Sequence, residues 1–256
     1  MNFDTLLKQP YYAEKLKICK FLGIKKGWRV LDVGCGQGST SIVCSYLVRD
    51  KGKVIGMDND EVLLNEAKKT VKKLKLKNIE LKLTDINKAN FPKDYFDIVL
   101  LIYTPQYVRS KEKLVSIMKR IKKWSKLLGI AEQSTKPKSR QEKLYFMLNK
   151  FNKELENILT GSKMSPYSKK EMVSLVKKAG WKIEKQRELE SKVMTPKRIW
   201  LDNVKRVKRW NMEIKRKYKL NRFDKKIKYI EKTIKSGLLP KFTDWYILLC
   251  KSNNKH

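Results

Sequence analysis

Two glycines and the residues around them have the types and the spacing that bind a nucleoside. Residues 30–38 read V-L-D-V-G-C-G-Q-G, an apolar segment that leads into a glycine-rich turn and then into a helical pattern. Such a turn presents backbone N–H groups and the N-terminus of a helix to a ligand. Gly34 and Gly36 let the backbone turn sharply and approach that ligand without an intervening Cβ. This pattern alone is a weak signal, and an ordinary strand-to-helix turn is the alternative.

Two further carboxylates follow the next two predicted strands. Asp58 comes directly after the apolar segment 53–57, at roughly the 20-residue distance from the glycines where an acid accepts hydrogen bonds from ribose hydroxyls. Asp85 follows the predicted strand 79–83 in the same way. The carboxyl ends of neighbouring parallel strands meet at one edge of a sheet, where open α/β sheets bind their ligands. Together with Asp32, these residues predict a nucleoside site.

The ligand that this turn favours carries a positive charge. Asp32 lies directly before the glycines, where a pyrophosphate would approach, and its carboxylate would repel a phosphate. Ser39 stands where the dinucleotide pattern G-x-G-x-x-G has its third glycine. An ammonium or sulfonium group near Asp32 is therefore favoured over a dinucleotide.

The composition limits the chemistry further. The chain has 256 residues, with 61 Lys and Arg against 26 Asp and Glu and a formal net charge of +35. Its one histidine is the terminal His256, which argues against histidine bases, triads and metal ligands. The four cysteines are scattered without a C-x-x-C pair, so we expect no metal site, no disulfides and a cytoplasmic protein. Neither a signal peptide nor an apolar run of the ~20 residues that span a bilayer is recognised.

Apolar segments and helical patterns alternate through the first half, which predicts an α/β fold with a parallel sheet. The expected strands are 28–33, 53–57, 79–83, 96–102, 128–132, 181–188 and 244–250. The expected helices are the opening segment to Leu22, 40–47, 60–74, 111–124, 141–159 and 169–178. We divide the chain into a main domain, 1–190 plus 241–256, and a basic helical insert, 191–240, with a second helical insert at about 134–170.

Four stretches together resemble the class I S-adenosylmethionine-dependent methyltransferases, and more narrowly their type 11 branch. They are V-L-D-V-G-C-G-Q-G at 30–38, V-I-G-M-D-N-D at 54–60, L-T-D-I at 83–86 and D-Y-F-D-I-V-L-L at 94–101. Their order and spacing agree with the family over about residues 16–130, and the two late strands are similar to its sixth and antiparallel seventh strands. The resemblance implies a Rossmann-like, doubly wound sheet of seven strands, with the basic insert as a helical cap. It also implies S-adenosylmethionine as the cofactor and S-adenosylhomocysteine as the product.

The resemblance implies roles for the residues at the first two strand ends. Asp32, Gly34 and Gly36 would bind the methionine end of the cofactor. Asp58 would hold the ribose hydroxyls.

The same resemblance implies neighbours for the adenine and the methyl group. Met57 or Asn59 would flank the adenine. Asp85 would accept a hydrogen bond from the adenine amino group, and Ile86 would donate its backbone N–H. The segment that begins at Leu101 would border the methyl group and the acceptor.

The class of methyl acceptor is limited mainly by the motifs that the sequence lacks. It has neither the Asn-Pro-Pro-Tyr or Asp-Pro-Pro-Tyr of adenine and cytosine amino methylases nor a Pro-Cys nucleophile, so we expect a small-molecule or lipid-like acceptor. Candidates for the acceptor pocket are Tyr11, Tyr12, Tyr103, Gln106 and Tyr107. For each tyrosine, a packed or surface side chain is the alternative. We assign no catalytic base, because methyl transfer from a sulfonium depends above all on positioning the acceptor.

The insert 191–240 has 17 Lys and Arg against 4 Asp and Glu. Apolar residues recur in it at helical spacing, from Leu201 to Tyr218 and from Phe223 to Leu238. It could bind RNA, lie on an anionic membrane surface or form a lid, and the alternative is a pair of helices packed on the main domain with a solvated basic face. An RNA or protein methyltransferase, and a scaffold that binds S-adenosylmethionine without catalysis, therefore stay open. The sequence does not indicate an oligomeric state.

Overall fold

The structure is a computed structural model that describes residues 3–162, 164–194 and 196–252. The terminal His256 lies outside the described residues. Within them, no helix is long and apolar enough to cross a membrane.

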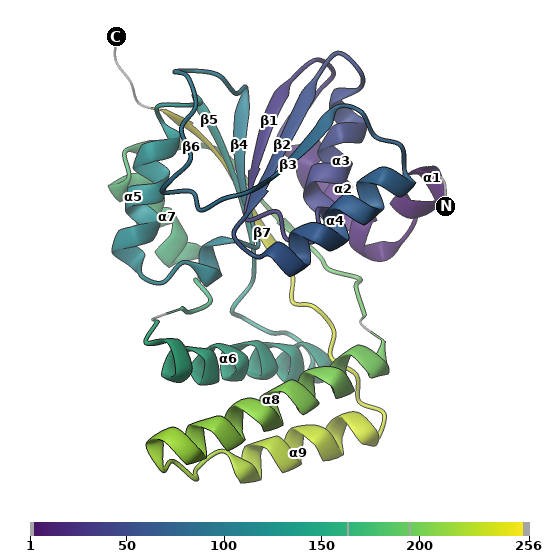
Figure 1. Ribbon diagram of the computed structural model, residues 1–256, viewed down its shortest axis with the longest axis vertical. Coiled ribbons are helices and arrows are strands. Elements are labelled where there is room, and N and C mark those ends of the chain that lie inside the picture. The colour runs from purple at the N-terminus through teal and green to yellow at the C-terminus, as the bar shows by residue number, and fades with distance from the viewer. Residues whose placement is uncertain (1–2, 163, 195, 253–256) are drawn as a thin grey trace.

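The centre of the molecule is one seven-stranded sheet (Figure 1). Its strands are β1 (Arg29–Val33), β2 (Lys53–Asp58), β3 (Ile79–Leu83), β4 (Ile98–Ile102), β5 (Leu127–Gln133), β6 (Trp181–Leu189) and β7 (Trp245–Ser252). They lie in the order β3-β2-β1-β4-β5-β7-β6, and β7 runs antiparallel to both of its neighbours. The expected α/β sheet of seven strands, with an antiparallel seventh strand, is confirmed.

Helices cover both faces of this sheet (Figure 1). They are α1 (Phe3–Leu7), α2 (Pro10–Phe21), α3 (Ser39–Val48), α4 (Glu61–Lys73), α5 (Lys111–Ile121) and α7 (Lys169–Lys178). Successive residues of β1 point to opposite faces, so Val30 packs with α2 and α3 while Leu31 packs with α5 and α7. The opening segment is two helices and not one, because Pro10 has no N–H to continue a helix and begins α2. Asp60 accepts a hydrogen bond from the backbone N–H of Leu63 and caps the N-terminus of α4.

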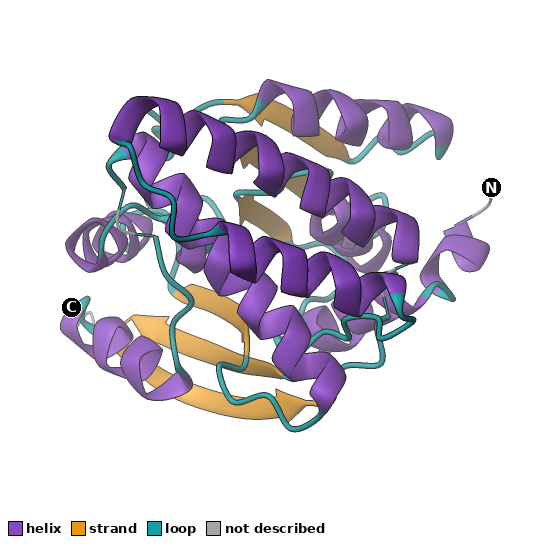
Figure 2. Ribbon diagram, turned by 90° about the horizontal axis from the view of Figure 1, so that it is seen from below, coloured by secondary structure: helices purple, strands orange, loops and turns teal. Residues whose placement is uncertain are grey.

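Three helices form a separate layer beyond the carboxyl ends of the parallel strands (Figures 1 and 2). We call α6 (Arg140–Thr160), α8 (Lys197–Tyr218) and α9 (Asp224–Lys235) the helical layer. Its apolar side chains form a core of their own, which includes Leu148, Phe151, Val204, Ile227 and Ile230. The apolar stripes of 191–240 are thus buried against α6 and against each other, and not on the sheet.

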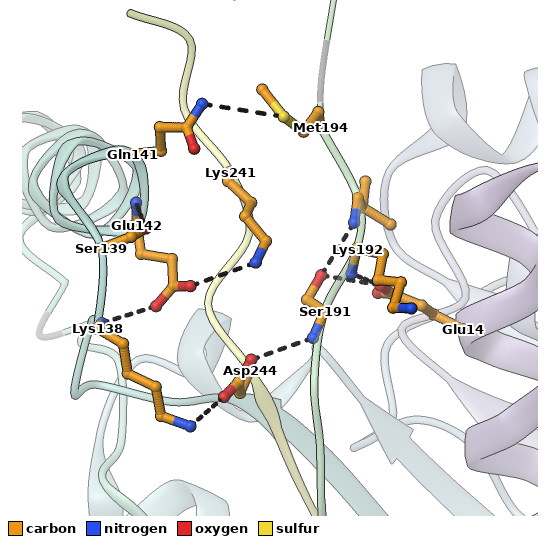
Figure 3. Close-up of polar contacts among 11 residues, drawn as sticks. Glu14, Lys138, Ser139, Gln141, Glu142, Ser191, Lys192, Met194, Lys241 and Asp244 are labelled. Carbon is orange, nitrogen blue, oxygen red and sulfur yellow. Dashed lines mark hydrogen bonds and ion pairs between the residues drawn. The ribbon is translucent and has the colours of Figure 1, made fainter.

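Buried carboxylates tie together the chain segments that cross between the sheet and the helical layer (Figure 3). Asp244 accepts hydrogen bonds from the backbone N–H of Ser191 at 3.1 Å and from the Lys138 ammonium at 2.6 Å. Glu142, in the first turn of α6, accepts from the backbone N–H of Lys138 at 2.7 Å and pairs with Lys241 at 3.6 Å. The segments before α6, before α8 and before β7 are therefore held side by side.

Candidate active site

The turn after β1 is built on glycines with left-handed backbone angles. Gly34 has φ +71° and Gly36 has φ +52°. The backbone N–H of Gly34 donates to the Met57 carbonyl at 2.8 Å, which fixes the turn against the end of β2. A Cβ on Gly34 would lie 2.5 Å from Cγ2 of Thr104, whereas a Cβ on Gly36 would meet only Cδ1 of Leu63, at 3.9 Å. The chain therefore needs glycine at position 34 for packing, and beside Gly36 it leaves open space that a ligand can occupy.

Asp58 is held at the end of β2 by the same turn. Its carboxylate accepts hydrogen bonds from the backbone N–H groups of Gly36 at 2.7 Å and of Asp60 at 2.9 Å. Each carboxylate oxygen has a second lone pair, so the group is fixed in place and can still accept bonds from a diol. Met57 points into the core below, and Asn59 is exposed beside the carboxylate.

Asp32 is only 1% exposed and lies beneath the first turn of α3. The Ser41 hydroxyl donates to its carboxylate at 2.6 Å. Burial raises the pKa of Asp32 to about 6, against the opposing effects of the Ser41 hydrogen bond and the positive charge of Lys15. Near neutral pH it carries most of a negative charge close to the glycine turn, which suits a cationic ligand.

Asp85 lies two residues beyond Leu83, which pairs with Asp58 across β2 and β3. The backbone N–H of Asn87 donates to its carboxylate at 2.7 Å and holds the pKa of Asp85 below its usual range. Ile86 packs against the core. The three predicted acids are thus brought to one edge of the sheet, whereas Leu101 is fully buried in the core below it.

Tyr103 follows β4 and adopts φ +62°, a conformation that a bulky residue rarely takes. Its hydroxyl lies 2.6 Å from the hydroxyl of Tyr145 on α6, and its ring lies 5.8 Å from that of Tyr107. Thr104, the next residue, donates from its hydroxyl to the Val33 carbonyl at 2.9 Å. The tyrosines at this strand end therefore stand directly beside the glycine turn.

The two N-terminal tyrosines lie on α2. The Ser39 hydroxyl lies 3.5 Å from the Tyr11 hydroxyl, which places Tyr11 at the first residue of α3. Tyr12 packs against the core, and burial raises its pKa. Of the two, Tyr11 is the one brought to the glycine turn.

A buried carboxylate that the sequence analysis did not single out lies at the end of β5. Glu132 is 2% exposed, and Gln106 donates to it from its backbone N–H at 3.3 Å and from its side-chain amide at 3.2 Å. Asn149 of α6 donates to the Gln106 side-chain carbonyl at 3.1 Å. Burial raises the pKa of Glu132 to about 8, so the group can exchange a proton near neutral pH.

Helix α6 presents a polar row to this region. Tyr145, Asn149 and Lys153 follow one another at four-residue spacing and therefore lie on one face of the helix. The Lys153 ammonium lies 3.6 Å from the centre of the Tyr107 ring, and burial lowers its pKa to about 8. Of the predicted acceptor-pocket residues, Tyr103, Gln106 and Tyr107 are brought together here, with Glu132, Tyr145 and Lys153 as additions.

The comparisons with known proteins agree with this geometry. A family model described as "Methyltransferase domain" matches residues 24–191, which is more than half of the chain. The chain belongs to the S-adenosylmethionine-dependent methyltransferase family. A solved methyltransferase of this kind from Aquifex aeolicus is 25% identical, with a TM-score of 0.54 over 73% of this chain and 90% of that one.

Curated relatives of this methyltransferase are of several kinds. It is 32% identical to a carboxy-S-adenosyl-L-methionine synthase of Sulfurimonas denitrificans, over 70% of this chain and 82% of the relative. It is 28% identical to a demethylmenaquinone methyltransferase of Bacillus cereus, over 43% of this chain and 48% of the relative. It is 29% identical to an uncharacterized protein of Methanocaldococcus jannaschii, over 70% of this chain and 47% of that protein. The chain thus spans about half the length of the last two.

The residues at the sheet edge fit S-adenosylmethionine, the cofactor of the family. The open space beside Gly36 admits a ligand against the backbone, and the fixed Asp58 carboxylate suits the ribose hydroxyls. The buried charge of Asp32 suits the positive methionine end. The individual contacts of Asp32, Gly34, Gly36, Asp58, Met57, Asn59, Asp85, Ile86 and Leu101 with the cofactor stay predictions.

Proposed function

We propose that this methyltransferase transfers a methyl group to a small-molecule or lipid-like acceptor held between the ends of β4 and β5 and helix α6. The observation that carries the proposal is the position of Glu132. Its carboxylate is buried, is bonded to Gln106, and lies in the cluster that Thr104 joins to the glycine turn. A buried carboxyl group that can exchange a proton near the glycine turn is the kind of group that a methyl acceptor with a hydroxyl or amine requires.

The chemistry divides between cofactor and protein. S-adenosylmethionine supplies an activated methyl group on a sulfonium, so the carbon–sulfur bond breaks as the bond to the acceptor forms. The protein positions the acceptor, and this orientation can account for much of the lowering of the barrier. With its pKa raised to about 8, Glu132 exchanges protons near neutral pH, and its ionised form takes the proton that the acceptor's hydroxyl or amine loses. The rings of Tyr103 and Tyr107, 5.8 Å apart, lie in the same cluster.

Two features support a small or lipid-like acceptor. Gln106, Glu132 and Tyr145 of the cluster are buried beside α6, which favours a small acceptor group over a folded macromolecule. A relative acts on demethylmenaquinone, a small molecule. The reaction is proposed to take place in the cytoplasm, where the four buried thiols stay reduced.

The test is incubation of the protein with methyl-labelled S-adenosylmethionine and a fractionated cell extract. We expect label in the small-molecule or lipid fraction, loss of labelling with Asp58→Ala, and strong reduction with Glu132→Gln. Label in RNA or in protein would instead assign a macromolecular acceptor. Binding of S-adenosylhomocysteine without label in any fraction would indicate the non-catalytic scaffold.

A further inference from the structure

Lys153 is a buried cation without an anion. It is 3% exposed, and no described carboxylate oxygen lies within 4.0 Å of its ammonium group. It also makes no hydrogen bond within the described part of the chain, and its ammonium lies on the Tyr107 ring at 3.6 Å. Burying a charge without a hydrogen-bonded partner costs free energy, and a bound anion would offset that cost. A buried lysine of this kind therefore suggests a ligand-binding role.

The charges nearest to Lys153 do not complete it. Glu132 and Glu156 both favour its protonated form, but burial outweighs them and the pKa of Lys153 stays below its usual range. Glu132 is itself raised in pKa by burial, and its carboxylate is already bonded to Gln106. The site therefore contains one cation in need of an anion and one acid that is protonated for much of the time near neutral pH.

A second buried donor in the same cluster lacks a partner. Gln133, beside Glu132 on β5, accepts a hydrogen bond from the Tyr145 hydroxyl through its side-chain carbonyl. Its side-chain amide nitrogen is buried and has no hydrogen-bond partner. Tyr145 is in turn bonded to Tyr103, whose ring neighbours Tyr107 beneath Lys153. A buried amide donor without a partner and a lysine without a carboxylate partner, in one tyrosine-lined cluster, point to a ligand that accepts hydrogen bonds.

We propose that the methyl acceptor is an anion, whose carboxylate or phosphate group binds Lys153 while its nucleophilic group faces Glu132. The proposal rests on the proposed function, because it names the class of molecule that the same site takes. An anionic group would give Lys153 a charge partner in place of the water that burial removes. It would also accept a hydrogen bond from a buried donor such as Gln133. The Tyr103 and Tyr107 rings favour an anion whose body is apolar or aromatic.

A set of four ligands with one ring and different head groups tests this. Phenyl phosphate, phenylacetate, benzylamine and benzyl alcohol are titrated by calorimetry into protein saturated with S-adenosylhomocysteine, at constant ionic strength. We expect phenyl phosphate or phenylacetate to bind, the tighter of the two identifying the head group, and benzylamine and benzyl alcohol to bind at least tenfold more weakly. Tighter binding of benzylamine or benzyl alcohol than of both anions would overturn the proposal, as would binding of neither anion.

Two lysine variants separate a ligand-binding role from a structural one. Lys153→Met is expected to weaken binding of the anion at least tenfold and to raise the melting temperature of the ligand-free protein, because it removes an unpaired buried charge. Lys241→Met is the matched control, since Lys241 pairs with the buried Glu142 at 3.6 Å. That variant is expected to bind the anion as the wild type does and to melt at a lower temperature. Unchanged anion binding by Lys153→Met would overturn the proposal.

Failure of the anionic-acceptor proposal and failure of the proposed methyl transfer give different results. Anion binding that depends on Lys153, without labelling of any extract fraction, would leave the anion site in place and remove the methyl transfer. Labelling of an acceptor without a negative charge would keep the methyl transfer and overturn the anionic acceptor.

Discussion

The hydroxyl groups of Tyr103 and Tyr145 lie 2.6 Å apart and join the end of β4 to helix α6. Tyr145 in turn donates to the side-chain carbonyl of Gln133 at the end of β5. Tyr103 has φ +62°, so a bulky residue in an unfavourable conformation is held there by its surroundings. One helix of the separate layer thus fixes two strand ends of the candidate active site.

Replacement of Tyr145 by Phe tests this link. The variant removes the hydroxyl shared by Tyr103 and Gln133, and it leaves the Gln133 amide without any partner. We expect the free energy of unfolding in urea to fall by about 1–3 kcal/mol, the cost of leaving buried polar groups unsatisfied. Tyr229→Phe is the control, because Tyr229 is 61% exposed, and it should be neutral. Equal stability of the two variants would contradict the link.

Asp58→Ala tests the cofactor site. We expect S-adenosylhomocysteine at about 100 times its Kd to stabilise the wild-type protein by roughly 2.7 kcal/mol, and to leave the melting temperature of the variant unchanged. The matched control is Asp97→Ala, because the Asp97 carboxylate likewise accepts a backbone N–H, that of Arg29, at 2.7 Å. Both variants lose a bond of the same type, and only the first should lose the ligand-induced shift. A normal shift in Asp58→Ala would refute the ribose assignment.

Gly34→Ala tests how the glycine turn is packed against Thr104. The added Cβ would lie 2.5 Å from Cγ2 of Thr104 and would occupy a residue with φ +71°. Backbone strain of about 1–2 kcal/mol and overpacking of about 1–3 kcal/mol both act against the fold. In Gly161→Ala, φ is +66° but no atom lies within 4 Å of the new Cβ, so only the strain remains. Urea denaturation should show the larger loss for Gly34→Ala, and equal losses would show that the contact with Thr104 is unimportant.

The cofactor half of the site could be predicted because its signals are local in sequence. Asp58 and Asp85 each follow a short apolar strand, and parallel strands bring their carboxyl ends to one edge whatever the rest of the chain does. The same reasoning applies to Glu132, which ends the predicted strand 128–132, and to Gln133, which follows it and ends β5. They lie outside the four stretches that resemble the family, so the resemblance implies no role for them.

The part of the acceptor site that lies on α6 could not be predicted, because its residues depend on where this helix docks. Tyr145, Asn149 and Lys153 form a polar row on α6, and in a sequence such a row is typical of the solvent face of an amphipathic helix. In the structure this row faces the strand ends, while Leu148, Phe151 and others face α8 and α9. Only the tertiary arrangement shows that both faces of α6 are covered.

The stability of the protein should depend on pH through Glu132. Burial raises its pKa in the folded state to about 8, above the usual value near 4.3. Its contribution is therefore fully present below about pH 4 and is lost as pH rises from there through about 8, because over this range the unfolded state has released the proton while the folded state still holds it. By about pH 8 this group has lowered the free energy of unfolding by on the order of 5 kcal/mol relative to acid pH.

Glu132→Gln removes this titration, so the difference in unfolding free energy between variant and wild type should grow in favour of the variant from about pH 5 to about pH 8. Asp32 titrates near the same range but is present in both proteins, whereas the pKa of Lys153 depends on Glu132, so the difference curve reports Glu132 together with its effect on Lys153. Glu80→Gln is the control of opposite sign: ion pairing with Lys53 lowers the pKa of Glu80, so its contribution is lost only in acid. Urea denaturation across this range measures all three proteins. A flat difference curve for Glu132→Gln would contradict the raised pKa of Glu132, because it would show that folding does not change the protonation of this carboxyl group.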